Sequence, residues 1–372
     1  MNGWLQPVAA GLVRPEHARD IISPAYDLLD PGLRRDHSRA HPRSFLNGTP
    51  SEGDDVDLDH ASRRAQAKAY LRAELDRGTW EFRGPSLYLL EIESGGHVQT
   101  GVVGDVAGDR FPDLISPHEA TKPDRVADLV DYFETVGFGS SPVGLAYRRT
   151  KAVDEAVARL QDRSPALDIT LDDGDHQRVW TVDTDAELAA ALASIPRAYI
   201  IDGHHRVAAT IGRGLAASSP GGRFLAVAFP HDQLSVFPFH RWLGIEMTSL
   251  LAQPGELATR PGHAVVVTRE GEWLIDLGTR PEEVDVAALA RTALADLGIE
   301  DERTDARLSF VPGFPGPEAL RRKVRGEGGV GFLLAPTSIE AVMDHSDRGE
   351  FMPPKATFFS PKPRSGVFLV RR

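Results

Sequence analysis

Residues 200–211 read IIDGHHRVAATI, and this stretch decides the fold that we expect. An apolar run ends at Asp202-Gly203, and a helical pattern starts at once with His204. Strands that pass through short turns into helices are typical of α/β proteins. Gly203 permits a tight backbone turn and the close approach of a ligand, because glycine has no Cβ atom. We therefore predict a mixed α/β fold.

The same junction is a candidate site for an anion. The first N–H groups of a helix have no partner within the helix, and the helix dipole makes that end positive. His204, His205 and Arg206 add donors and positive charge at this point. We therefore predict that 202–206 bind a phosphate group or a nucleotide. The alternative is that Asp202 caps the helix and that its neighbours are solvated polar residues.

Helical and strand patterns alternate on both sides of this junction. Helices are expected at 33–40, 58–76, 123–136, 151–161, 185–194, 204–215, 284–297, 317–324 and 338–345. Strands are expected at 86–93, 98–106, 142–147, 178–183, 197–202, 224–229, 234–239 and 331–334, with a hairpin at 264–277. We expect the first 50 residues to be largely irregular and the tail to be rich in proline.

A chain of 372 residues predicts two or three domains. We divide it into an N-terminal helical and irregular segment at 1–84, a nucleotide-binding core at 85–245, and a C-terminal α/β region at 246–372. The tail of the last region is expected to complete the site.

Composition excludes several classes of function. Lys and Arg total 42 and Asp and Glu total 54, and this net charge of −12 argues against a nucleic-acid partner. The chain has no cysteine, which rules out disulfides, thiolate metal sites and a Cys nucleophile. No apolar run approaches the length that spans a membrane, and no signal peptide is evident. We expect a cytoplasmic protein with a small-molecule substrate and no membrane partner, and the oligomeric state stays open.

Two further segments carry candidate chemistry. In Ser116-Pro117-His118-Glu119-Ala120-Thr121-Lys122, Glu119 could act as a general base with His118 as its positioning partner. The alternative is a loop that caps the following helix. In Met352-Pro353-Pro354-Lys355-Ala356-Thr357, Lys355 and Thr357 are candidate donors to an anionic group, although a lysine next to prolines is often only exposed. His240-Arg241 is ambiguous in the same way.

Two other patterns are better explained without a ligand. Residues 326–331 read GEGGVG, but a helix is expected before them and a strand after them, the reverse of a dinucleotide-binding loop. His37 and His41 have the spacing of paired metal ligands, but Pro42 ends that segment, which favours a solvated surface pair. The chain contains no P-loop.

These segments, in this order, resemble the domain-of-unknown-function 1015 family. The landmarks of the resemblance are Ser23-Pro24-Ala25-Tyr26-Asp27, Pro117-His118-Glu119-Ala120-Thr121 with Asp124-Arg125, Ser141-Pro142, Asp202-Gly203-His204-His205-Arg206, His240-Arg241, Met352-Pro353-Pro354-Lys355-Ala356-Thr357 and Ser365-Gly366. The resemblance extends over most of the chain.

Three of the segments also resemble free-serine kinases of the ParB/sulfiredoxin-like superfamily. They are Pro-His-Glu, Asp-Gly-His-His-Arg, and a tail present here as Gly349-Glu350 followed by Pro354-Lys355-Ala356-Thr357. The resemblance implies a ParB/sulfiredoxin-like core with additional N- and C-terminal α/β regions. It implies a kinase that transfers a phosphoryl group from ATP or ADP to the hydroxyl of free L-serine or a similar amino acid.

The resemblance also implies roles for individual residues. Glu119 becomes the catalytic base with His118 beside it, and Asp202, Gly203, His204, His205 and Arg206 bind the nucleotide phosphates. Apart from the resemblance, Lys355 and Thr357 could hold the carboxylate of an amino-acid acceptor or a phosphate, and Arg241 is a candidate substrate-binding residue. Mg²⁺ is expected with Asp202 as a candidate ligand. The alternative is a ParB-like nucleotide-binding switch or regulatory module without kinase activity. The chemistry of sulfiredoxins is excluded because it needs a cysteine.

Overall fold

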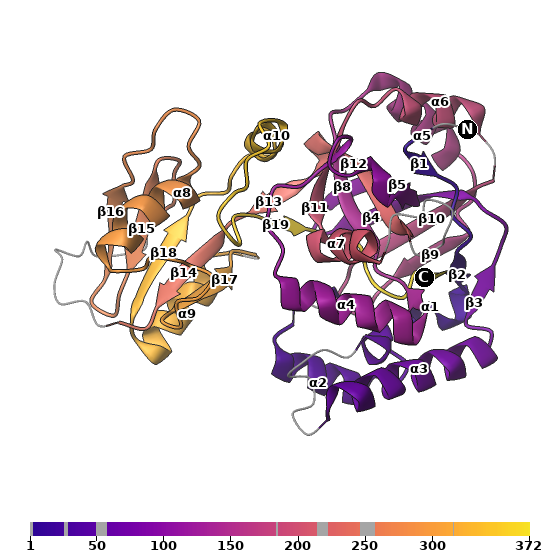
Figure 1. Cartoon of the computed structure of the whole chain (residues 1–372), viewed down its shortest axis with the longest axis horizontal. Helices are drawn as coiled ribbons and strands as arrows, with labels where there is room; N and C mark the ends of the chain where they lie inside the picture. Colours follow the sequence, from indigo (N-terminus) through magenta and orange to yellow (C-terminus); the bar gives the residue numbers. More distant parts are fainter. Residues whose placement is uncertain are drawn as a thin grey trace. The chain divides into compact units, whose positions relative to one another are not determined.

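The computed structural model describes residues 3–25, 29–49, 58–183, 185–213, 222–245, 257–314 and 316–372 (Figure 1). Its mixture of sheets and helices confirms the predicted mixed α/β class. The chain forms two compact units. Unit 1 comprises Met1–Ser116, Thr121–Gln233 and Pro361–Arg372, and unit 2 comprises Pro117–Ala120 and Leu234–Ser360.

The described part of unit 1 is built around a nine-stranded sheet. Eight of its strands follow the order β6-β11-β8-β12-β5-β4-β10-β9, and β1 also pairs with β5. The strands are β1 (Leu5–Gln6), β4 (Leu87–Ser94), β5 (His97–Ala107), β6 (Ile115–Ser116), β8 (Val143–Tyr147), β9 (Leu167–Thr170), β10 (His176–Val182), β11 (Ala198–Asp202) and β12 (Arg223–Pro230). The β6–β11 and β8–β12 pairs are parallel and the other pairs are antiparallel. The sheet is therefore mixed.

The β4–β5 hairpin shows how the sequence sets the register of this sheet. Gly95 and Gly96 both have positive φ, at 58° and 83°, as a tight hairpin turn requires. Ser94 is consequently paired with His97, and the pairing continues along the strands to Tyr88 and Val103. This confirms the hairpin predicted from the sequence.

The described helices of unit 1 are α1 (Pro15–Ile21), α2 (Pro31–Ala40), α3 (His60–Asp76), α4 (Pro123–Val136), α5 (Lys151–Gln161), α6 (Ala186–Ala193) and α7 (His204–Gly212). Helices α5, α6 and α7 bury apolar side chains against the sheet. Short 3₁₀ turns occur at Phe45–Gly48, Gly108–Arg110 and His231–Gln233. One apolar cluster joins Val153 of α5, Leu188 of α6 and Val207 of α7 to sheet residues such as Leu145 and Ile200. The N-terminal end of α7 is thus fixed by a packed core.

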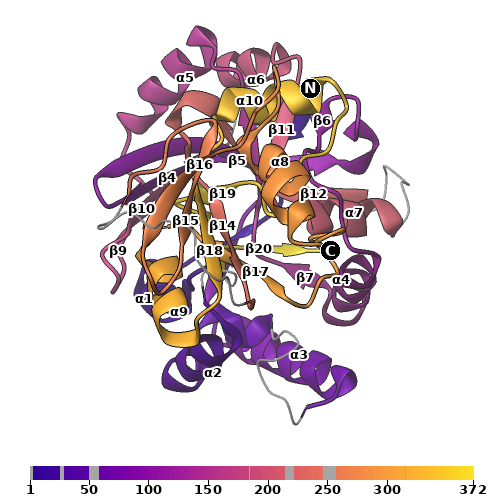
Figure 2. The same ribbon diagram turned by 90° about the vertical axis from the view of Figure 1, so that its left-hand side faces the viewer.

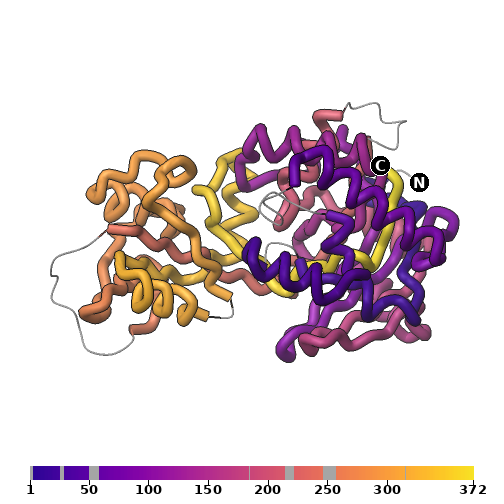
Figure 3. The backbone as a smooth tube through the Cα atoms, turned by 90° about the horizontal axis from the view of Figure 1, so that it is seen from below, coloured from indigo at the N-terminus to yellow at the C-terminus, as the bar shows by residue number. Residues whose placement is uncertain are grey.

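The N-terminal region is more ordered than the sequence analysis expected. Residues 15–21 form α1, where Pro15 occupies the first turn because proline needs no N–H partner there. Strand β2 (Gly11–Val13) lies between β3 (Trp80–Phe82) and β20 (Phe368–Arg371), and β20 also pairs with β7 (Phe138–Gly139). The C-terminal strand thus pairs with an N-terminal one. In Figure 3 the marks for the two ends of the chain lie on the same side of unit 1. Local sequence patterns cannot reveal such long-range pairing.

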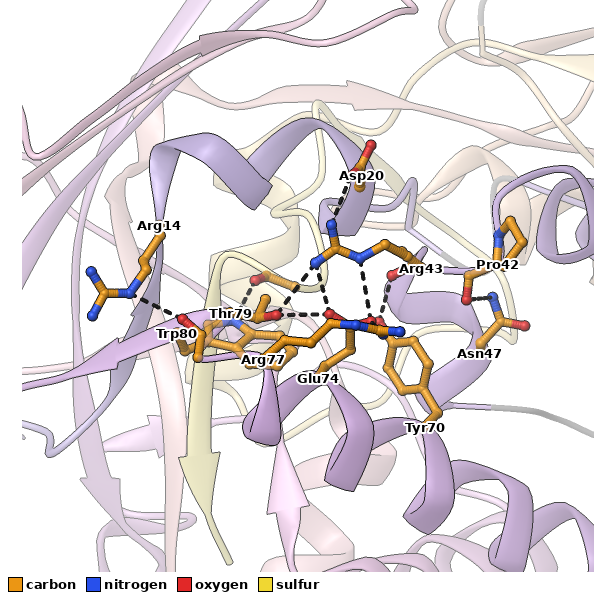
Figure 4. Close-up of polar contacts among 12 residues, drawn as sticks. Arg14, Asp20, Pro42, Arg43, Asn47, Tyr70, Glu74, Arg77, Thr79 and Trp80 are labelled. Atoms are coloured by element: carbon orange, nitrogen blue, oxygen red, sulfur yellow. Dashed lines mark hydrogen bonds and ion pairs between the residues drawn. The ribbon is translucent and has the colours of Figure 1, made fainter.

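An ion pair between Glu74 of α3 and Arg43 links this helix to the segment that follows α2 (Figure 4). The carboxylate of Glu74 is almost completely buried and accepts hydrogen bonds from Arg43 Nη2 at 2.8 Å and Thr79 Oγ1 at 2.7 Å. Arg77 Nη1 donates to its other oxygen at 2.6 Å. Burial alone would raise the pKa of Glu74, but the hydrogen bonds from Arg43 and Thr79 outweigh it and lower this pKa.

The described part of unit 2 contains a five-stranded antiparallel sheet in the order β16-β15-β18-β14-β17 (Figure 2). Its strands are β14 (Phe239–Leu243), β15 (His263–Val267), β16 (Glu272–Asp276), β17 (Leu308–Pro312) and β18 (Val330–Leu334). Strands β13 (Ser235–Phe237) and β19 (Phe358–Ser360) form a separate pair. Helix α9 (Glu318–Glu327) packs Leu320 and Val324 against Val265 and Leu333 of the sheet.

Two predicted elements of unit 2 differ from the structure. The single strand expected at 234–239 is divided at Pro238 into β13 and β14, which belong to different sheets. Proline has no N–H group to donate to a continuous ladder, which accounts for the break. The helix expected at 284–297 consists of α8 (Asp285–Leu289) followed by a π-helical turn at Ala290–Leu294. Helix α10 (Ile339–Asp347) agrees closely with its prediction.

The two units group the chain differently from the predicted segments 1–84, 85–245 and 246–372. Residues 1–84 lie in unit 1, and so does the C-terminal stretch Pro361–Arg372. The pairing of β1 with β5 and of β2 with β20 accounts for this grouping.

Candidate functional site

The sequence landmarks fall into two sets, one in each unit. Ser23, Ser141, Asp202–Arg206 and Ser365 lie in unit 1. His118-Glu119, His240-Arg241 and 352–357 lie in unit 2. Residues 26 and 27 of the first landmark are outside the described residues. Each set is built by its own unit.

The junction of unit 1 has the strand–glycine–helix geometry predicted from the sequence. Strand β11 ends at Asp202, Gly203 adopts φ +97°, and α7 begins at His204. A Cβ atom on Gly203 would lie 2.8 Å from Arg206 Nη2. The left-handed backbone therefore favours glycine, and a Cβ atom here would displace the Arg206 guanidinium group.

Two cations meet the carboxylate of Asp202 at this turn. Arg206 Nη2 donates to Asp202 Oδ2 at 2.5 Å, and Lys362 Nζ donates to Asp202 Oδ1 at 2.8 Å. Burial alone would raise the pKa of Asp202, but the charges of Lys362 and Arg206 outweigh it and hold this pKa well below its usual range. The carboxylate is therefore ionised, and the cluster carries a net positive charge at the start of α7.

Backbone and hydroxyl groups from other landmarks hold Arg206 in place. Arg206 Nη1 donates to the carbonyl oxygens of Ser141, at 2.6 Å, and Pro142, at 2.8 Å. The hydroxyl groups of Ser141 and Ser365 share a hydrogen bond of 2.5 Å, and Ser23 N donates to the Ser365 carbonyl at 3.0 Å. Four landmarks that are far apart in the sequence thus converge on one turn.

Lys362 is the residue of this junction that the sequence analysis missed. It stands between Pro361 and Pro363, just before the landmark Ser365-Gly366. A basic residue inside a proline-rich tail next to a family landmark was the available signal. Its side chain is only 8% exposed, so it is a built-in part of unit 1 and not a solvated surface lysine.

The two histidines of the motif differ in environment. His204 is largely buried, whereas His205 is half-buried. His205 Nε2 accepts a hydrogen bond of 3.0 Å from the backbone N–H of Lys122, the residue that precedes α4. Accepting through Nε2 requires that nitrogen to be unprotonated. His205 therefore connects the starts of α7 and α4.

Asp202 does not suit the role of a Mg²⁺ ligand in this arrangement. Each of its oxygens already accepts a hydrogen bond from a cation, and Mg²⁺ would have to displace at least one of them. Among the described residues there is no group of three or more His, Asp or Glu side chains that could hold a metal ion. The assignment of a metal to Asp202 stays a prediction without support from the geometry.

In unit 2, the Pro-His-Glu segment contacts the landmark at 352–357. His118 is 2% exposed, and its Nε2 atom lies 3.2 Å from Thr357 Oγ1. The His118 carbonyl accepts a hydrogen bond of 2.8 Å from Met352 N. The segment at 352–357 is therefore held at both ends by one histidine. Glu119, the next residue, is half-buried.

Lys355 lies at the centre of that segment in an uncommon conformation. Its φ is +53°, and it is one of two non-glycine residues with positive φ among the described residues. Its side chain is exposed, with Nζ 5.0 Å from the centroid of the Phe239 ring. Backbone strain of this kind persists only where the surroundings enforce it.

Arg241, a predicted substrate-binding residue, lies on β14 in the interior of unit 2. Its side chain is completely buried, and Nε donates to Glu302 Oε2 at 2.8 Å. Nη1 donates to the carbonyls of Phe239 and Lys355, and Nη2 donates to that of Pro354. Burial lowers the pKa of Arg241, while the charges of Glu302 and Glu119 oppose that effect. Glu302 was missed because nothing local in its sequence marks it.

A profile of the family described as "Protein of unknown function (DUF1015)" matches residues 5–291. The chain belongs to this family. The match contains Glu119, 202–206 and Arg241, and it ends before Lys355, Thr357 and Lys362. This confirms the family resemblance stated from the sequence.

Other comparisons bear on the DUF1015 chain less directly. No protein of curated function matched it. A structure titled "Free serine kinase in complex with AMP" is 16% identical, covers 71% of this chain and 91% of that chain, and has a TM-score of 0.41. SbnI with a C-terminal truncation, from Staphylococcus aureus, is 12% identical, covers 71% and 85%, and has a TM-score of 0.41. A conserved hypothetical protein from Pyrococcus furiosus is 16% identical, covers 71% and 94%, and has a TM-score of 0.37. Similarity at this level does not assign an activity.

Within the described residues, no helix combines the length and apolar character needed to cross a membrane.

Proposed function

We propose that the protein is a small-molecule kinase that transfers a phosphoryl group from ATP or ADP to the hydroxyl of free L-serine or a similar amino acid. The observation that carries the proposal is the pair of cations, Arg206 and Lys362, held by one carboxylate at a glycine turn that opens a helix. Phosphoryl transfer depends on positive charge placed around the phosphate oxygens. The sequence has no P-loop that would supply it.

The junction of unit 1 binds the nucleotide phosphates in this proposal. The start of α7 is the positive end of the helix dipole, which favours the binding of an anion. Arg206 and Lys362 add charge, and Asp202 holds both of them in position before the ligand arrives. Gly203 keeps the approach to these groups free of a side chain.

The segments of unit 2 act on the acceptor. The exposed ammonium group of Lys355 attracts the carboxylate of the amino acid. The contact between His118 and Thr357 fixes the Pro-His-Glu segment and with it the neighbouring Glu119. Glu119 is the general base of the proposal, because its carboxylate can accept the proton of a hydroxyl group.

The proposed reaction is an in-line displacement at the terminal phosphorus of the nucleotide. The acceptor hydroxyl oxygen attacks the terminal phosphorus, a new O–P bond forms, and the P–O bond to the rest of the nucleotide breaks. The hydroxyl proton passes to Glu119. Arg206 and Lys362 stabilise the charge that develops on the departing nucleotide.

Mg²⁺ commonly accompanies nucleotides and neutralises charge on their phosphate oxygens when it is bound. Because both oxygens of Asp202 are engaged by cations, we assign this ion no protein ligand.

The test is a phosphorus NMR assay of the purified protein with Mg²⁺, L-serine, and ATP or ADP in separate reactions. We expect a signal from O-phosphoserine with one of the nucleotides. The Glu119→Gln variant should lose about 100-fold or more in kcat, the usual contribution of a general base, while its nucleotide affinity stays unchanged. Glu327→Gln, which alters an exposed carboxylate of the same unit, is the matched control.

Two results would contradict the proposal in different ways. Tight nucleotide binding without transfer to any hydroxyl-bearing amino acid would favour the nucleotide-binding switch. Full activity of Glu119→Gln would remove Glu119 as the base and leave the nucleotide site untouched.

A further inference from the structure

The buried ion pair between Arg241 and Glu302 contacts the backbone of residues 352–357 of unit 2, which we call the acceptor segment. Arg241 and Glu302 are 0% and 7% exposed at their side chains, and they are joined at 2.8 Å. The ring of Phe310 also lies against the guanidinium group, 4.8 Å from Cζ to its centroid. Burying two charges is costly unless their remaining groups are satisfied, and here the guanidinium donates to backbone carbonyls as well.

Two of those carbonyls belong to the segment that carries Lys355. Arg241 Nη2 donates to the Pro354 carbonyl at 2.9 Å, and Nη1 donates to the Lys355 carbonyl at 3.0 Å. These bonds fix the two peptide groups on either side of the left-handed turn at Lys355. An apolar side chain of similar volume could fill the space but could not hold that backbone.

The ion pair therefore stabilises the backbone conformation at Lys355, which apolar packing alone would not do. Non-glycine residues adopt φ near +53° only when neighbouring groups compensate for the strain. The segment is held at its ends by His118, and at its centre by Arg241. The backbone conformation at Lys355 determines where its exposed side chain starts.

We propose that the Arg241–Glu302 pair is a positioning element that holds the Pro354-Lys355 backbone so that Lys355 meets the carboxylate of the acceptor. The inference rests on the function proposed above and adds Glu302 to the residues on which it depends. It also gives Arg241 an indirect role in place of contact with the substrate. Arg241 and Glu302 act through Lys355 and do not touch the reacting atoms.

The test replaces both members of the pair at once, by Arg241→Met with Glu302→Leu. Removing one partner alone would leave a buried unpaired charge and could unfold the unit, whereas a joint apolar replacement is often tolerated. We expect the KM for the acceptor to rise about tenfold, the effect of losing one or two hydrogen bonds that fix the segment, with the Kd for nucleotide unchanged. Amide hydrogen exchange between 352 and 357 should accelerate by a similar factor.

The chain offers a closely matched control. Arg321 and Glu272 form a second buried pair in unit 2, joined at 2.7 Å, and Arg321 donates to the Leu257 carbonyl instead of the acceptor segment. The variant Arg321→Met with Glu272→Leu should leave both the KM for the acceptor and exchange at 352–357 unchanged.

The outcomes separate the inference from the function on which it rests. Unchanged KM and unchanged exchange in the Arg241/Glu302 variant would overturn the inference, and so would equal effects in the control. Faster exchange with an unchanged KM would also overturn it, because ordering of the segment would then not serve the acceptor. If the unaltered protein phosphorylates no acceptor, the proposed function itself fails, and the exchange data alone decide whether the pair orders the segment.

Discussion

Lys362 donates a hydrogen bond of 2.8 Å to Asp202, a residue 160 positions earlier in the chain. This contact places a lysine from the C-terminal tail at the start of α7, where Arg206 occupies the other carboxylate oxygen. Because one carboxylate orients two cations, the positive charge is arranged before any anion binds. Such preorganisation reduces the cost of ordering side chains during binding.

Lys362→Met tests whether the tail lysine serves the nucleotide. We expect the Kd for ADP to increase about tenfold or more, because a charge-assisted hydrogen bond to a phosphate oxygen is lost. Isothermal titration calorimetry measures the effect. Lys151→Met is the control, because Lys151 belongs to the same unit and its side chain is 89% exposed. Equal affinities of the Lys362→Met variant and the unaltered protein would refute the role of Lys362.

Gly203→Ala tests the turn itself. Alanine at φ +97° is strained, and its Cβ would press on the Arg206 guanidinium, so we expect a loss of about 2 kcal/mol in unfolding free energy. Nucleotide affinity should fall as well, because Arg206 must move. Denaturant unfolding and calorimetry report the two effects. Gly84→Ala is the matched control, since that site has open space and an ordinary φ. Similar losses in the two variants would argue against a special geometry at Gly203.

Thr357→Val tests the contact between the two landmarks of unit 2. Valine keeps the shape of the side chain but removes the hydroxyl that lies 3.2 Å from His118 Nε2. We expect the KM for the acceptor to rise by about threefold to tenfold, with nucleotide affinity unchanged. Steady-state kinetics at saturating nucleotide measures the change. Thr304→Val, on the exposed surface of the same unit, should have no effect. A normal KM in the Thr357→Val variant would mean that the contact does not serve the acceptor.

Glu74→Gln tests the hydrogen bonds that the buried carboxylate of α3 accepts from Arg43 and Thr79. The pKa of Glu74 is lowered in the folded protein, so this carboxylate contributes stability that is present above its ordinary pKa and is lost as the pH falls through the lower folded value. The variant should lose about 2 kcal/mol at pH 7, because hydrogen bonds to a charged group are weakened.

The stability difference between the unaltered protein and Glu74→Gln should shrink as the pH decreases below the ordinary carboxyl pKa of about 4.3. Thermal unfolding at a series of pH values measures the difference. Glu187→Gln, at a side chain that is 80% exposed, is the control and should show no such trend. A difference that stays constant with pH would contradict a lowered pKa at Glu74.

Local signals were sufficient for the elements that have clear ends. Pro123 and Gly137 delimit α4 because proline suits the first turn and glycine adopts the left-handed conformation that ends a helix. The turn at Gly95-Gly96 likewise fixed the β4–β5 hairpin. The strand, glycine turn and helix at 198–212 follow from the same rules, and the anion site proposed there stays a prediction.

Features that depend on distant partners could not be predicted in this way. Strand β17 has weak periodicity and exists because it pairs with β14. The sequence does not distinguish Arg241 from an exposed arginine. Only the tertiary structure shows that Glu302 and backbone carbonyls accept hydrogen bonds from its guanidinium group. Lys362 had only the weak signal of its place in the proline-rich tail next to Ser365-Gly366, and its partner Asp202 is visible only in the tertiary structure.

The most direct test of the central claim is a crystal structure of the protein with ADP and Mg²⁺ bound. We predict that the phosphates lie against the N-terminal end of α7, with oxygens at about 3 Å from Arg206 and Lys362. Phosphates bound anywhere else, with Asp202, Arg206 and Lys362 unchanged and without contact to the nucleotide, would contradict it.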